Sequence, residues 1–205
     1  GIVDRFVLVE AAQNHRGNSK PLFFADNTDR FAEWRGKIEH IVLDTLPESD
    51  DPWVLENAQR NAIADGLPTV RDDDLVLVSD VDEIPRPEVL KALIANPSVA
   101  IAGLRMPLFY LRFNYLQIRG ADAVYVWGVA ARGHVYRQLG PQALRDARVA
   151  LQRRSWEGSL RDGEMVCQHA GWHFSYLGDD AHVHLKLNSF AHREAKVSVD
   201  FEKQG

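Results

Sequence analysis

Two aspartates separated by one residue follow a short apolar run and carry the clearest chemical signal in this chain. Residues 74–85 read DLVLVSDVDEIP. A continuously apolar run of this length is typical of a buried strand, and ligand sites in α/β sheets lie beyond the carboxyl ends of such strands. In extended backbone Asp80 and Asp82 point the same way, and neighbouring carboxylates repel each other unless a cation lies between them. The pattern predicts a divalent metal site that would neutralise a phosphate-bearing substrate.

The same acids also have a purely structural explanation. Acidic residues that follow a strand often cap the next helix. Pro85 and Pro87 suit a helix start, and we expect a helix over residues 87–94. Taken alone, the motif does not separate a metal site from a helix cap.

Histidines crowd the C-terminal part and supply further candidate ligands. His173 lies in the segment AGWHFSY, residues 170–176, and neutral imidazole is a good ligand for Mn²⁺ already held by carboxylates. The alternative for any one histidine is a half-buried side chain that hydrogen-bonds within a sheet. The other histidines in this part are His169, His182, His184 and His192, of which His182 and His184 are expected on a solvated helix face.

Two basic residues are candidates for contacts with a pyrophosphate. Arg60 lies in the helix before the metal strand, and Lys186 lies in the segment LKLNSF, residues 185–190. A basic group beside a diphosphate leaving group would stabilise its charge, whereas the alternative is a solvated salt bridge. Four aromatic residues could stack on sugar rings or pack in the core: Trp127, Trp172, Tyr110 and Phe113.

The elements that must position these residues alternate in the first half of the chain. We expect strands at 6–9, 38–43 and 74–79, and a helix from Pro52 to Asp65 that Gly66 ends. This alternation predicts a largely parallel sheet with right-handed crossovers. The second half is expected to contain strands at 99–105, 124–129 and 165–176, an aromatic-rich segment at 109–115, a helix at 142–151 after a break at Gly140-Pro141, and a helix from 178–180 to Phe190.

Length and composition exclude several classes of protein. The 205 residues suit one domain, and the net charge of -5 argues against a general nucleic-acid binder. One cysteine, Cys167, allows no internal disulfide and fits a reducing compartment. No apolar run approaches the roughly 20 residues that span a bilayer, and no signal peptide is visible. We therefore expect a cytoplasmic protein without a membrane segment, which could still bind peripherally to a membrane.

Five segments, taken in order, resemble glycosyltransferase family 17 in its bacterial-type members. They are FVLVE at 6–10, KPL at 20–22, SDVDEIP at 79–85, AGWHFS at 170–175 and KL at 186–187. The similarity runs from Asp4 to about Phe190, and the combination of DVDEIP with AGWH is more specific than either motif alone. The family includes N-acetylglucosaminyltransferases that act on N-glycans, as well as many bacterial relatives.

The resemblance implies a fold, a donor and a stereochemical course. It implies an α/β fold of the GT-A type, with a mostly parallel Rossmann-like sheet flanked by helices, and inversion at the anomeric carbon. The donor would be a UDP-sugar, with UDP-GlcNAc favoured, and the metal Mn²⁺ or Mg²⁺. Residues 1–205 would form a single catalytic domain, with a donor and metal-binding half at 1–98 and an acceptor-side half at 99–205. Family members usually carry a further strand and helix before the segment equivalent to Val3-Asp4, so we expect this sequence to lack that first β-α unit.

The resemblance also assigns roles to particular residues. Asp80 would face the ribose or the metal, Asp82 would bind the metal, and His173 would be the third protein ligand. The donor-binding set would be Glu10, Lys20, Arg60, Asp80 and Lys186, and the acceptor-binding set Trp127 and Trp172.

An inverting transfer also requires a general base for the acceptor hydroxyl, and the candidates are Glu164, Asp122 and Glu83. Glu83 is expected to point to the opposite side of an extended strand from Asp82. The acceptor could be a bacterial surface polysaccharide or another glycan as readily as an N-glycan.

Two other functions remain open from the sequence. The first is a metal-dependent phosphohydrolase that acts on nucleotide sugars through Asp80, Asp82, His169 and His173. The second is a non-catalytic glycan-binding module, in which the aromatic residues form the platform and the acids only cap a helix.

Overall fold

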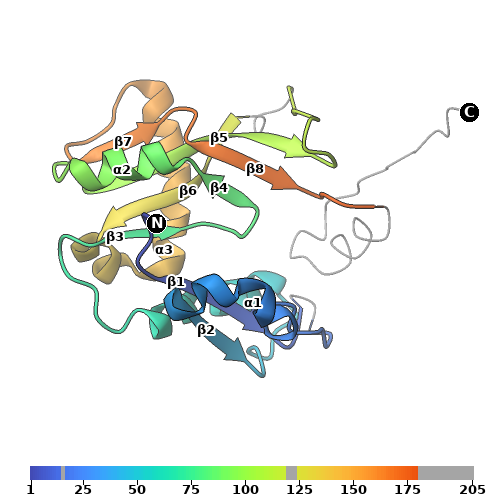
Figure 1. Cartoon of the computed structure of the whole chain (residues 1–205). Helices are drawn as coiled ribbons and strands as arrows, with labels where there is room; N and C mark the ends of the chain where they lie inside the picture. The colour runs from blue at the N-terminus through green and yellow to red at the C-terminus, as the bar shows by residue number, and fades with distance from the viewer. Residues whose placement is uncertain (15–16, 119–123, 180–205) are drawn as a thin grey trace, which may run out of the picture.

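The computed structural model describes residues 1–14, 17–118 and 124–179, which form two sheets with helices packed against them (Figure 1). The elements in chain order are β1 (Phe6–Ala11), η1 (Ala25–Lys37), β2 (Ile38–Leu43), α1 (Pro52–Asn61), η2 (Ala62–Gly66), β3 (Leu75–Val78), β4 (Glu83–Pro85), α2 (Pro87–Ala95), β5 (Ile101–Tyr110), β6 (Val124–Arg132), α3 (Gly133–Glu157), β7 (Glu164–Cys167) and β8 (Gly171–Ser175).

The larger sheet is mixed, so the prediction of a mostly parallel Rossmann-like sheet is wrong. β1 and β2 form a parallel pair, and the larger sheet has the order β3-β6-β5-β8-β4, with β7 also paired to β5. The pairs β3·β6, β5·β6 and β4·β8 are antiparallel, whereas β5·β7 and β5·β8 are parallel. The physical reason is connectivity: parallel neighbours need a crossover, and the described residues place no helix between the neighbouring strands β5 and β6.

β5 is the strand that organises the larger sheet. Its first part, from Ile101 to Leu104, pairs with β7, and its last part, from Leu108 to Tyr110, pairs with β8. β6 lies along its other edge, with an irregularity in the register between Leu104 and Arg105. The sheet therefore carries β7 at one end of β5 and β8, with His173, at the other.

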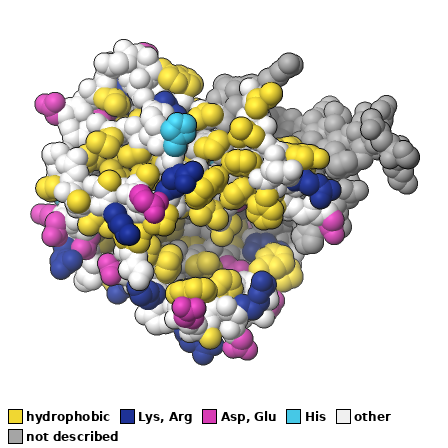
Figure 2. All heavy atoms as spheres, turned by 45° about the horizontal axis from the view of Figure 1, so that its top comes forward, with side chains coloured by type: hydrophobic (Ala, Val, Ile, Leu, Met, Phe, Trp, Pro, Cys, Tyr) yellow, Lys and Arg dark blue, Asp and Glu magenta, His cyan; other side chains and the backbone are white. Residues whose placement is uncertain are grey.

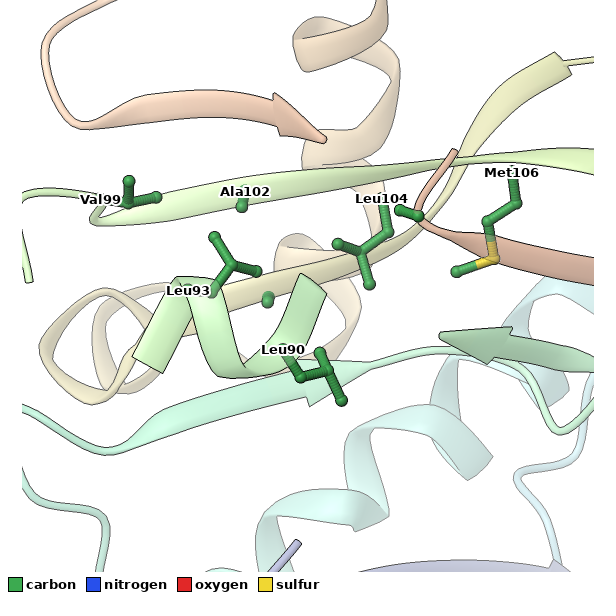
Figure 3. Close-up of a cluster of buried hydrophobic side chains, with 8 residues drawn as sticks. Leu90, Leu93, Val99, Ala102, Leu104 and Met106 are labelled. Atoms are coloured by element: carbon green, nitrogen blue, oxygen red, sulfur yellow. The ribbon is translucent and has the colours of Figure 1, made fainter. Parts of the chain in front are cut away.

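Helices cover both faces of this sheet. On one face Leu90 and Leu93 of α2 pack against β5 side chains that include Leu104 and Met106 (Figure 3). On the other face α3 contributes Leu144 and Leu151, which are fully buried with strand residues of β3 and β6. Burial of these apolar side chains supplies the main stabilisation and fixes α3 against the sheet.

Most predicted elements of the first half are present, with shifted ends. The strands at 6–9, 38–43 and 74–79 correspond to β1, β2 and β3, and the predicted helix from Pro52 is α1 continued by the 3-10 helix η2 as far as Gly66. The predicted helix at 87–94 is α2, which has Pro87 in its first turn. The 3-10 helix η1 was not expected from the sequence.

The second half differs more from the expectation. The break at Gly140-Pro141 is present, since Gly140 has φ 76° and ψ 170°, but helical residues precede it and α3 extends from Gly133 to Glu157. The predicted strand at 165–176 is two strands, β7 and β8, separated where His169 has a φ of 50°. The helix predicted from 178–180 to Phe190 lies outside the described residues apart from its first two positions.

Gly171 allows β8 to approach β4 closely. A Cβ atom at this position would lie 2.1 Å from the carbonyl oxygen of Ile84, a distance that no side chain tolerates. The small residue in the AGWH segment thus brings His173 opposite Glu83 in the β4·β8 pair. This packing explains the glycine in that motif.

Within the described part of the chain, no helix combines the length and the apolar character needed to cross a membrane.

We predict that Leu93→Ala will lower the free energy of unfolding by about 2–5 kcal/mol, because it leaves a cavity between α2 and β5. Ile94→Ala is the matched control on the same helix, since Ile94 is 48% exposed and its truncation opens no cavity. Urea denaturation of both variants measures the difference. Equal stabilities of the two variants would contradict this assignment of the core.

Candidate functional site

The two aspartates lie in a tight turn rather than in a strand. β3 ends at Val78 and β4 begins at Glu83, and the backbone N–H of Glu83 donates to the carbonyl oxygen of Asp80 across 3.0 Å. This contact between residues i and i+3 closes a β-turn. The prediction that Asp80 and Asp82 share one side of an extended backbone is therefore wrong. Their side chains instead contact different elements.

Arg145 of α3 holds the Asp80 side of the turn. Its guanidinium donates to both carboxylate oxygens of Glu83, at 2.9 and 2.5 Å, and to Oδ2 of Asp80 at 2.7 Å. It also donates to the carbonyl oxygen of Trp127 in β6. The side chains of Arg145 and Glu83 are 2% and 0% exposed. A buried bidentate pair of this kind fixes geometry, because each charge would be costly without the other.

Arg60 of α1 approaches Asp80 from the other side. It donates to Oδ1 of Asp80 at 3.2 Å, to Glu56 at 2.8 Å and to Gln142 of α3 at 2.7 Å. Both oxygens of Asp80 thus accept from guanidinium groups. We refer to Arg60, Asp80, Glu83 and Arg145 as the carboxylate–guanidinium cluster.

The cluster shifts the pKa values of its members. Partial desolvation works against the charge of Asp80, whose side chain is 45% exposed, but Arg145 and Arg60 hold the pKa of this carboxyl below its usual range. Burial, reinforced by the charge of Asp80, raises the pKa of Glu83 against the attraction of Arg145. Burial also opposes the charge of Arg145, yet its two acidic partners raise the pKa of this guanidinium. Asp80 is therefore an ionised carboxylate over the physiological pH range.

Asp82 faces β8 and His173. Nε2 of His173 lies 3.5 Å from Oδ1 of Asp82, and the backbone N–H of Phe174 donates to the carbonyl oxygen of Asp82. The ring of Trp127 packs edge-on against His173, with centroids 4.2 Å apart. Nδ1 of His173 and Nε1 of Trp127 are both buried and have no hydrogen-bond partner among the described residues. Such orphaned polar atoms are typical of places where a ligand or ordered water binds.

Two of the three predicted metal ligands, Asp82 and His173, are placed where they could hold a metal ion together. Asp82 and His173 carry suitable donor atoms close together, whereas both oxygens of Asp80 already accept from Arg60 and Arg145. In keeping with this, no three His, Cys, Asp or Glu side chains of the described ranges gather into a group that could hold a metal ion. Mg²⁺ and related ions commonly use one or two protein ligands and complete their shell with water and substrate phosphates. The Asp82–His173 pair suits that arrangement.

Two of the predicted base candidates do not lie open beside this pair. Glu83 is enclosed in the cluster with Arg145. Glu164 lies opposite Ile101 at the far end of β5, seven residues or about 23 Å from the level of His173. There it makes a bidentate ion pair with Arg154, at 2.8 and 2.6 Å. The third candidate, Asp122, lies outside the described residues.

Among the predicted donor-binding residues, Arg60 and Asp80 belong to the cluster, and Glu10 and Lys20 make contacts elsewhere. Glu10 accepts from the backbone N–H groups of Phe24 and Ala25 and lies 3.0 Å from His40. Lys20 lies over the ring of Phe23. Lys186 falls outside the described residues, as do His182, His184 and His192.

The predicted sugar-stacking residues separate into two groups. Trp127 borders His173, but Trp172 alternates with His173 along β8 and packs under the guanidinium of Arg86, 4.0 Å from the ring centroid. Arg86 also donates to the carbonyl oxygen of His169. Trp172 is thus covered on one ring face and does not share the side of His173.

Aromatic rings also gather at the end of β5 and in the loop beyond it. Tyr110 packs on Tyr176, with centroids 5.1 Å apart, and Phe113 packs edge-on against Phe174 at 5.3 Å while remaining 73% exposed. A hollow of about 700 Å³ borders this loop, lined by Leu111, Arg112, Phe113, Asn114, Leu177, Gly178 and Asp179. Figure 2 shows one face of the molecule, on which hydrophobic side chains cover a broad area.

Sequence reasoning missed Arg145 and its neighbour Arg148, although a signal was present. Leu144 and Leu151 are seven residues apart and mark the buried side of the predicted helix. Arg148 lies four residues after Leu144, and Arg145 lies seven before the buried Gln152. Charged residues at buried helical positions need a partner or a ligand, and this pattern points to the site.

The fold and site therefore define a mixed α/β protein with paired acidic and histidine side chains at the end of its larger sheet. The chain belongs to glycosyltransferase family 17, whose family model matches residues 1–122. It is similar to the β-1,4-mannosyl-glycoprotein 4-β-N-acetylglucosaminyltransferases of Homo sapiens and Rattus norvegicus, with 32% identity to each over 92 residues. The match covers 41% of this chain and 17% of each relative, so it represents less than a fifth of their length. No solved structure matches the chain.

We predict that Arg145→Met will lower the free energy of unfolding by about 3–5 kcal/mol, because it leaves the buried Glu83 without its cation. Arg153→Met is the control, since Arg153 lies exposed on the same helix. Urea denaturation measures both variants. The double variant Glu83→Gln with Arg145→Met should recover part of the loss. A stability for Arg145→Met equal to that of Arg153→Met would refute a structural role for the cluster.

We predict that the stability difference between the wild type and Asp80→Asn depends on pH. Because the folded-state pKa of Asp80 is depressed, its charge contributes stability above the unfolded-state pKa of about 3.9. That contribution is lost as pH falls through the lower folded-state value. The melting temperatures of the wild type and Asp80→Asn should therefore begin to approach each other below about pH 4 in a series from pH 7 to pH 3. The exposed control Asp162→Asn should follow the wild type throughout. A difference that stays constant over this range would contradict the ion pairs of Asp80.

Proposed function

We propose that this protein is an inverting glycosyltransferase that transfers a sugar from a UDP-sugar donor to a glycan acceptor. The observation that supports the proposal is the proximity of Asp82 to His173 beside the carboxylate–guanidinium cluster, in a chain that belongs to glycosyltransferase family 17. The names of the two relatives specify transfer of N-acetylglucosamine, which favours UDP-GlcNAc as the donor.

The proposal assigns different tasks to the two aspartates. Asp82 and His173 would hold Mn²⁺ or Mg²⁺, and Asp80 would keep the turn in place through Arg145 and Arg60. A bound metal would supply positive charge for the two phosphates and for the charge that develops as UDP leaves. Asp80 does not need to bind the metal in this assignment. Its exposed fraction of 45% leaves it accessible to a polar group of the donor.

The acceptor is proposed to lie toward the aromatic end of β5. Trp127 borders His173, and Phe113 is the exposed ring of the group that includes Phe174. Aromatic rings present an apolar face on which a sugar ring can stack. Phe174 follows His173 directly and its N–H binds the backbone of Asp82, so the aromatic group adjoins the proposed metal position.

We predict that Mn²⁺ will strengthen the binding of UDP-GlcNAc and that Asp82→Asn will remove this gain, because the variant loses a charged ligand beside His173. Titration calorimetry of UDP-GlcNAc with and without Mn²⁺ measures both. Asp162→Asn is the matched control, with the same chemical change on an exposed residue.

Binding of UDP-GlcNAc that is indifferent to the metal and to Asp82 would overturn the metal assignment. Rapid release of phosphate or nucleoside monophosphate from UDP-GlcNAc without an acceptor would instead identify a phosphohydrolase. Glycan binding that survives Asp82→Asn in a protein with no affinity for UDP would identify a glycan-binding module.

A further inference from the structure

Arg148 of α3 is partly buried, and its guanidinium makes no hydrogen bond with the described residues. Its Nε atom is buried and unpartnered. Burial, followed by repulsion from Arg145, lowers the pKa of its guanidinium, which nevertheless remains charged because arginine stays protonated in proteins. An N–H donor that is removed from water without an acceptor is costly, so the orphaned Nε–H of Arg148 needs an explanation.

The other guanidinium groups of the site differ from Arg148 in this respect. Arg145 donates to Glu83, Asp80 and Trp127, and Arg60 donates to three side chains. These two cations are therefore committed to holding the protein together. Arg148 is the guanidinium next to the cluster that retains its hydrogen-bonding capacity in the described structure.

Arg148 lies beside the carboxylate–guanidinium cluster. It is three residues after Arg145 on α3, and the carboxylates of Glu83 and Asp80 are close enough to raise its pKa in part, as is Tyr125 when ionised. The ring of Tyr125 packs against Trp127 at 5.5 Å, and Trp127 packs against His173. The rings of Tyr125 and Trp127 thus form a chain of contacts that leads from the neighbourhood of Arg148 to His173.

We propose that Arg148 binds a phosphate group of the substrate, namely the diphosphate of a nucleotide sugar held at the Asp82–His173 pair. A guanidinium presents several N–H donors in one plane, which matches the oxygens of a phosphate. The identity of the ligand as a nucleotide sugar rests on the proposed function, whereas anion binding by Arg148 does not. The proposal replaces Arg60 with Arg148 as the arginine that contacts pyrophosphate.

The test compares Arg148→Met with Arg153→Met, which removes the same charge from an exposed position of the same helix. Calorimetry measures the binding of inorganic pyrophosphate and of UDP, both with Mn²⁺. We expect Arg148→Met to raise the Kd for both ligands about tenfold or more, since a charge-assisted hydrogen bond is lost. Arg148→Lys should give an intermediate value because it keeps the charge without the planar donors.

A second measurement separates binding from a structural role. Without ligand, Arg148→Met should melt at the wild-type temperature or above it, because no described partner loses its bond and the repulsion with Arg145 disappears. A fall in melting temperature as large as that of Arg145→Met would overturn the proposal. Equal UDP affinity in Arg148→Met and Arg153→Met would also overturn it, without affecting the proposed function.

The remaining outcomes distinguish the two proposals. Pyrophosphate binding that depends on Arg148, in a protein with no affinity for UDP or UDP-GlcNAc, would support the anion site and overturn the nucleotide-sugar function. A wild type that binds neither pyrophosphate nor UDP would overturn both.

Discussion

The buried guanidinium of Arg145 is the interaction on which the arrangement of the site depends. It connects α3 to the turn between β3 and β4 through Asp80 and Glu83, and to β6 through the carbonyl oxygen of Trp127. A charge that is 2% exposed must keep its partners, so the turn cannot relax into an extended strand without breaking these bonds. The geometry of the aspartate motif thus follows from a residue more than sixty positions away.

This constraint divides the acidic motif into a structural part and a part for which we propose ligand binding. Asp80 and Glu83 are held by Arg145, while Asp82, on the same turn, faces His173 on β8. The close approach of β8 to β4 at Gly171 sets the register that brings this histidine opposite Glu83. Polar atoms that are buried without a hydrogen-bond partner among the described residues occur in His173, Trp127 and Arg148, and the proposed donor site is built from these three residues together with Asp82.

Local patterns in the sequence predicted the strands β1, β2 and β3 and the starts of α1 and α2. Those predictions succeeded because apolar runs, prolines at helix starts and glycine stops act over a few residues. The mixed sheet, the turn at Asp80 and the enclosure of Glu83 were not predictable in this way, since they depend on how distant strands and α3 meet. Glu164 illustrates the limit: an acid in a strand looked like a base candidate, but its partner, Arg154, comes from a different element.

A crystal structure of this chain with UDP and Mn²⁺ would test most directly whether Asp82 and His173 hold the metal while Arg145 holds Asp80 and Glu83. We predict the metal between Asp82 and His173, the diphosphate within hydrogen-bonding distance of Arg148, and Arg145 still bound to Asp80 and Glu83. A structure in which UDP binds away from Asp82, or in which Asp80 leaves Arg145 to bind the metal, would contradict it.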